Sequence, residues 1–99
     1  MAQVAGGIGV YGYDATGGDA YAALDTPITA PAGHTQYWHI QAWCATFPAQ
    51  MSFDGGVTDG PVIPAGGSIA VDDVQIPGPV YAKNSTAGSN YTALHVFVW

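Results

Sequence analysis

The chain has 99 residues, a length that fits one small domain. Its formal charge is −6 with a single Lys or Arg, so it lacks the basic patch that nucleic acids and anionic membranes require. Only 8% of the residues are charged, whereas 48% are hydrophobic and 12% are aromatic. A free monomer normally carries more charge, and we therefore expect partners to cover much of the surface. Glu and Arg are absent and Lys and Leu are few, although helices in soluble domains commonly rely on these residues, and this predicts an all-β fold.

Residues 1–25 are rich in Gly, Ala and Tyr. Val4, Ile8, Val10 and Tyr11 favour a weak strand, but the glycines among them make it costly to order. We predict a Gly/Tyr-rich N-terminal arm or edge hairpin that packs on the domain or on an adjacent subunit. A loosely ordered terminus is the open alternative. The segment lacks the basic and hydrophobic regions of a signal peptide, which predicts synthesis in a cytoplasm.

Residues 26–99 have the pattern of a β-sandwich domain. A proline-punctuated connection is expected at 26–33, followed by strands near 34–46, 50–54, 68–76, 80–84 and 90–99, each closed by Gly, Pro, Asn or Ser. The spacing predicts about seven short antiparallel strands, as in a small sandwich or barrel.

The two longest predicted strands are apolar or aromatic on both faces. Because side chains alternate across a strand, we expect Trp38, Ile40, Ala42 and Cys44 on one face of the first, opposite Tyr37, His39, Gln41 and Trp43. In the last strand we expect Thr92, Leu94, Val96 and Val98 opposite Tyr91, Ala93, His95, Phe97 and Trp99. One face of each strand meets the core of the chain, so the other is expected to meet a partner. The predicted interface residues are Tyr37, His39, Trp43, His95, Phe97 and Trp99.

No catalytic, cofactor-binding or metal-ligating set is predicted, and the chain is not expected to be an enzyme. The histidines His34, His39 and His95 have no ligand spacing between them, although His39 and His95 would face each other if their strands were neighbours. Asp72 and Asp73 would point to opposite faces of a strand and cannot easily act as an acid–base pair. Cys44 is the only cysteine and is expected to be a buried, inert thiol.

Three stretches carry a family resemblance: residues 28–30, 62–69 and 76–83. In the second, Ala-Gly precedes a strand, and in the third, a Gly-x-Val-x-Ala run lies in the next strand. This pattern resembles a recurrent small β module of tailed-bacteriophage virions, found in head decoration (cement) proteins and head fibres. The resemblance implies a β-sandwich or jelly-roll-like fold, often trimeric, with no catalytic residues and no cofactor.

We therefore expect a structural virion protein that is made in the host cytoplasm and binds the outer capsid surface. Its expected partners are further copies of itself, as in the trimers that the resemblance implies, and the major capsid protein or another virion protein. A tail or neck accessory protein is a close alternative. A carbohydrate-binding or receptor-binding β-sandwich that uses the same aromatic face is the alternative from another class. A small cupin-like metalloenzyme that uses the histidines is the weakest alternative.

Overall fold

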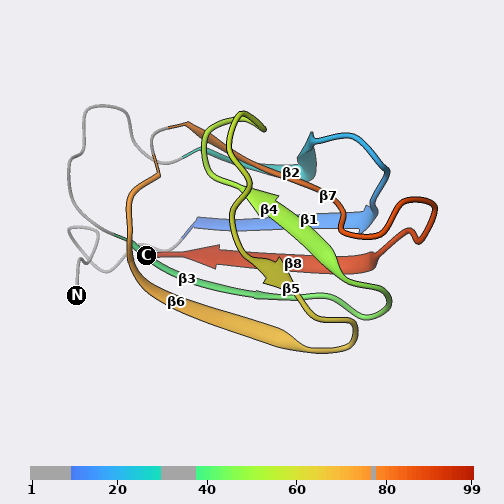
Figure 1. Ribbon diagram of the computed structural model, residues 1–99. Helices are drawn as coiled ribbons and strands as arrows, with labels where there is room; N and C mark the ends of the chain where they lie inside the picture. Colours follow the sequence, from blue (N-terminus) through green and yellow to red (C-terminus); the bar gives the residue numbers. More distant parts are fainter. Residues whose placement is uncertain (1–9, 30–37, 77) are drawn as a thin grey trace.

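The computed structural model describes residues 10–29, 38–76 and 78–99, and within these ranges it contains strands and no helix (Figure 1). The strands are β1 (Val10–Thr16), β2 (Ala22–Thr29), β3 (Trp38–Trp43), β4 (Ala49–Ser52), β5 (Val62–Ile63), β6 (Ser68–Val74), β7 (Pro79–Asn84) and β8 (Thr92–Val98). All of their pairings are antiparallel. The predicted all-β class is confirmed.

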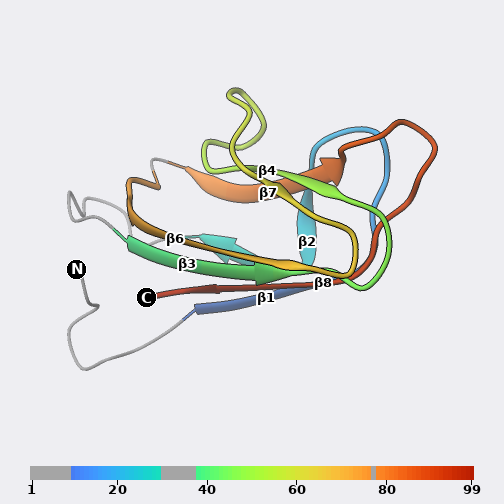
Figure 2. The same ribbon diagram turned by 60° about the horizontal axis from the view of Figure 1, so that its bottom comes forward.

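The strand order is that of a jelly roll. In chain numbering the order is β5-β4-β7-β2-β1-β8-β3-β6, so β1 pairs with β8, β2 with β7, β3 with β6 and β4 with β5. Such nested pairings arise when one long hairpin is rolled up, which gives the two Greek keys of this fold. Figure 2 shows β4 and β7 in one layer, with β1, β3 and β8 in the other. The two layers join where β1 meets β2, at a register that pairs Tyr13 with Thr26, and the sheet is nearly closed.

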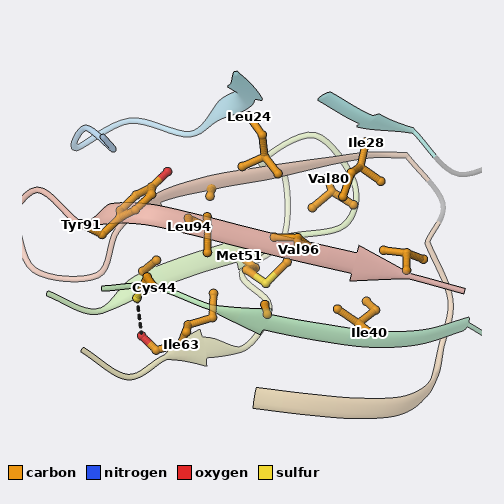
Figure 3. Close-up of a cluster of buried hydrophobic side chains, with 14 of the residues drawn as sticks. Leu24, Ile28, Ile40, Cys44, Met51, Ile63, Val80, Tyr91, Leu94 and Val96 are labelled. Atoms are coloured by element: carbon orange, nitrogen blue, oxygen red, sulfur yellow. Dashed lines mark hydrogen bonds between the residues drawn. The ribbon is translucent and has the colours of Figure 1, made fainter. Parts of the chain in front are cut away.

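The core fills the space between the two layers. Leu94 and Val96 of β8 and Ile40 of β3 meet Met51 of β4 and Val80 of β7, and each of the five is at most 1% exposed (Figure 3). Every strand except β1 and β6 contributes at least one fully or almost fully buried apolar side chain to this cluster. Burial of this kind, at roughly 25 cal/mol per Å² of apolar surface, is the main force that holds the layers together.

The N-terminal part of the domain differs from the prediction. Residues 10–16 form β1, which lies between β2 and β8 inside the sheet order rather than at an edge. The glycines help this packing. At Gly12 a Cβ atom would lie 2.6 Å from Ile28, and at Gly17 it would lie 1.7 Å from the Tyr91 ring, so both positions need a residue without a side chain. Residues 1–9 of the predicted arm lie outside the described residues.

The predicted connection at 26–33 is wrong for its first part, because β2 extends from Ala22 to Thr29. Pro27 lies inside this strand. The pairing of β2 with β7 shifts register between Ala23 and Ile28, and a bulge of this kind tolerates a residue that has no N–H to donate. With β2 included, the described residues contain eight strands, one more than the number expected.

Candidate interaction face

The outer surface of the β1–β8–β3 part of the sheet carries those predicted interface residues that the structure describes. In β8, Leu94, Val96 and Val98 point into the core and are at most 1% exposed. The alternate residues His95 and Phe97 are half-buried and lie on the opposite face, as predicted.

The same alternation is present in β3. Trp38, Ile40 and Ala42 are buried, as is Cys44 just after the strand, while His39, Gln41 and Trp43 are on the outer face. Trp43 is 37% exposed even though rings surround it. Tyr37 lies outside the described residues.

Strand register brings the outer rings together. Tyr13 and Trp43 are both paired with His95, from β1 and β3, and Tyr11 is paired with Phe97. The ring of Trp43 is 5.0 Å from His95 and 5.7 Å from Phe97, and Tyr11 is 4.8 Å from Phe97. We call these five residues, Tyr11, Tyr13, Trp43, His95 and Phe97, the outer aromatic cluster.

His95 is at the centre of the outer aromatic cluster. Its ring lies almost parallel to Trp43, with an interplanar angle of 13°. Tyr13 approaches from β1 at 4.8 Å, and the Tyr11 hydroxyl is hydrogen-bonded to Nδ1 of His95. Offset stacking of this kind stabilises each ring pair by about 0.5–1.5 kcal/mol beyond simple burial. The cluster is therefore a preformed surface.

His39 and Trp99 form a second, smaller contact at the end of the same face. Their ring centroids are 4.2 Å apart, and the backbones of the two residues exchange hydrogen bonds of 2.8 and 3.0 Å. Nδ1 of His39 is hydrogen-bonded to Asp72 of β6. β3 and β8 are neighbours, but their register places Trp43, rather than His39, opposite His95. The two histidines therefore have separate surroundings.

Tyr11 and Tyr13 were not among the predicted interface residues. In residues 10–13 the tyrosines alternate with Val10 and Gly12, a pattern that would place both tyrosines on one face of a strand. The glycines argued against a stable strand in this segment, so the pattern was not used. Tyr91, which strand alternation placed on the aromatic face, is instead fully buried. It precedes β8, and the strand is irregular at Ala93, whose φ is 50°. The regular two-residue period therefore does not extend back to Tyr91.

Tyr91 belongs to a polar group at the junction of the two layers. Its hydroxyl donates a 2.7 Å hydrogen bond to Oδ2 of Asp14, a carboxylate only 7% exposed. Burial raises the pKa of Asp14, and the nearby Asp25 carboxyl raises this pKa further. Oδ2 of Asp25 accepts the Ala15 N–H at 2.8 Å. Two carboxyl groups thus lie beside the β1–β2 seam, one of them largely dehydrated.

The outer face of the β2–β7–β4 layer is arranged differently, because the chain covers part of it. Ser52, although on the outer side of β4, is fully buried and donates to Oδ1 of Asp54 at 2.7 Å. Asp54 also accepts the N–H groups of Val57 and Thr58, and these bonds lower its pKa to about 2. The loop that follows β4 is therefore tied down over its own strand.

The described residues contain no group of three His, Cys, Asp or Glu that would hold a metal ion. An open pocket of about 190 Å³ is lined by Phe53, Asp54, Thr58, Asp59, Gly60 and Gln75, and it is smaller than usual small-molecule sites. Cys44 is buried, as predicted, and its thiol donates to the Phe47 carbonyl oxygen at 3.2 Å. Burial raises the pKa of this thiol, which disfavours the reactive thiolate.

Comparison with known proteins found no matching family model, no matching curated protein and no matching solved structure. In the part of the chain that the structure describes, no helix is long and apolar enough to cross a membrane.

Proposed function

We propose that this protein is a structural virion protein of a tailed phage, a capsid decoration protein that associates with copies of itself and binds the outer capsid surface. Its role is assembly and includes no catalytic step. The outer aromatic cluster is the contact surface, joined at one end by His39 and Trp99. The observation that carries the proposal is the concentration of five rings in contact with one another on the outer side of a sheet whose inner side already forms the core.

The contrast between the two outer faces supports this proposal. Ser52 on the β4 side is covered by a loop of the chain, whereas Tyr11 and Trp43 are 38% and 37% exposed. The outer aromatic cluster contains no Asp, Glu, Lys or Arg. Interface cores are enriched in aromatic side chains and depleted of charge, so this face has the composition of a contact surface.

The fold and the overall charge are consistent with the same role. Jelly rolls recur in viral capsid proteins, although fold alone does not assign function. With a formal charge of −6, the protein is better suited to the outside of a particle than to contact with packaged DNA. Association of aromatic faces proceeds despite this charge because apolar burial contributes about 25 cal/mol per Å².

The oligomeric state tests the proposal. Size-exclusion chromatography with multi-angle light scattering is expected to show a defined oligomer of the purified chain, such as a trimer. A monomer at every accessible concentration would contradict self-association. Immunogold electron microscopy of virions would then distinguish the capsid surface from a tail or neck position.

A carbohydrate-binding or receptor-binding module is the second candidate. It is favoured by the partial exposure of Tyr11 and Trp43, since aromatic rings stack on sugar rings. The exposed amide of Gln41, two residues before Trp43 in β3, adds a polar group beside them. Titration with oligosaccharides, followed by tryptophan fluorescence, distinguishes the two functions. Saturable quenching by a sugar in a monomeric protein would favour this second function over the first.

A further inference from the structure

We infer that His95 makes contact between copies of this chain pH-dependent, with association favoured at neutral pH and weakened by acid. This inference rests on the proposed self-association through the outer aromatic cluster. It adds a regulatory role for one residue at the centre of that surface.

The surroundings of His95 are aromatic on both sides. From β1 it meets Tyr11 and Tyr13, and from β3 it meets Trp43. These tyrosines are the titratable groups that face it, and a phenol ordinarily brings no negative charge near neutral pH. Among the described residues, no carboxylate forms an ion pair with His95. A proton taken up by His95 would therefore add a positive charge that no neighbouring anion balances.

His39 provides the contrast within the same face. Its Nδ1 is bonded to the Asp72 carboxylate, and this side chain of Asp72 is 65% exposed. Protonation of His39 completes an ion pair at the edge of the surface, where water also screens the charge. The two histidines of the face should thus respond differently to acid.

The direction of the effect follows from desolvation. In a separate subunit a protonated His95 is stabilised by water and by the faces of the surrounding rings. Contact with a second copy removes the water, and an unpaired charge in a dry contact is costly. If the contact is two-fold, it also brings two such charges toward each other. Histidine is the side chain that ordinarily changes charge between about pH 5 and 8, so measurements near the two ends of this range test the effect.

Sedimentation velocity of the wild-type chain at pH 7.5 and pH 5.5 tests the inference. Each histidine that must be neutral for association can weaken it by up to about tenfold per pH unit. We expect the dissociation constant of self-association to rise by at least about tenfold between the two conditions. Circular dichroism at both values checks that the subunit remains folded.

Two variants assign the effect to one residue. His95→Gln removes the imidazole, so the ratio of its dissociation constants at the two pH values is expected to be close to one, whatever its affinity at pH 7.5. His95→Asn is the second choice if the first variant fails to fold. His39→Gln also changes the contact surface and can lower the affinity at both pH values, but it should keep the wild-type ratio of the two dissociation constants. The inference would be overturned by wild-type oligomers that are equally stable at both pH values, or by a His95→Gln variant whose association weakens with acid as much as that of the wild type. Either result would leave the proposed self-association standing. A wild-type chain that is monomeric at both pH values would overturn the proposed self-association as well.

Discussion

Replacement of Trp43 by Lys is expected to disrupt association while the subunit still folds. A tryptophan has roughly 250 Å² to bury. At 37% exposed, Trp43 therefore has about 90 Å² left for a partner to cover. At 25 cal/mol per Å² this area contributes about 2 kcal/mol to each contact, which corresponds to about 30-fold in the dissociation constant. The lysine charge adds a desolvation cost, so we expect a loss of at least about 30-fold.

Val57→Lys is the matched control for this experiment. Val57 is 86% exposed in the loop after β4 and lies outside the outer aromatic cluster. Both variants change the formal net charge of each copy by the same amount, from −6 to −5. The lysine stem can still cover the rings of His95 and Phe97, which limits the loss of folding stability. Light scattering across a dilution series measures association, and thermal unfolding checks the fold. Equal association of the two variants would refute the assignment of the interface.

Three further predictions concern the fold. Because its folded pKa is raised above 3.8, Asp14 contributes stability at acid pH that is lost as the pH rises through that pKa. In urea unfolding, the free energy of unfolding of Asp14→Asn should therefore increase relative to that of the wild type between pH 4 and pH 7. A difference between the two free energies that stays constant over this range would contradict the prediction. Gly17→Ala should destabilise the fold by about 1–3 kcal/mol through overlap with Tyr91, whereas Gly18→Ala, with nothing within 4 Å, should not. Asp54→Ala should speed hydrogen exchange of the loop amides that donate hydrogen bonds to this carboxylate. Unchanged exchange rates would argue against its role in anchoring the loop.

The strand faces were predictable because alternation is a local property of the sequence. The apolar residues at 38, 40, 42 and 44 all proved buried, and His39, Trp43 and Phe97 lie on the opposite side. A two-residue period identifies both faces wherever a strand is regular. It fails where the backbone departs from that geometry, as it does between Tyr91 and Leu94, next to the positive φ of Ala93.

Other features depend on contacts between distant parts of the chain. A glycine such as Gly12 weakens a strand when the sequence is considered alone. In the structure, however, the missing side chain at Gly12 leaves space for Ile28 of β2. This close approach depends on the pairing of β1 with β2, which the sequence does not reveal. Tyr11 joins His95, 84 positions later, because β1 lies beside β8. Pro27 argued against a strand, and only the bulge in the β2–β7 pairing accommodates it.

Hydroxyl-radical footprinting of the chain below and above its association concentration measures directly whether a partner covers the aromatic face. In a single subunit Tyr11 and Trp43 are each more than one-third exposed, and Val57 is 86% exposed. We expect oxidation of Tyr11 and Trp43 to fall on association, while oxidation of Val57 stays constant. Equal oxidation of both rings in the separate and associated protein would show that the face remains open to water, and would contradict its role as the contact surface.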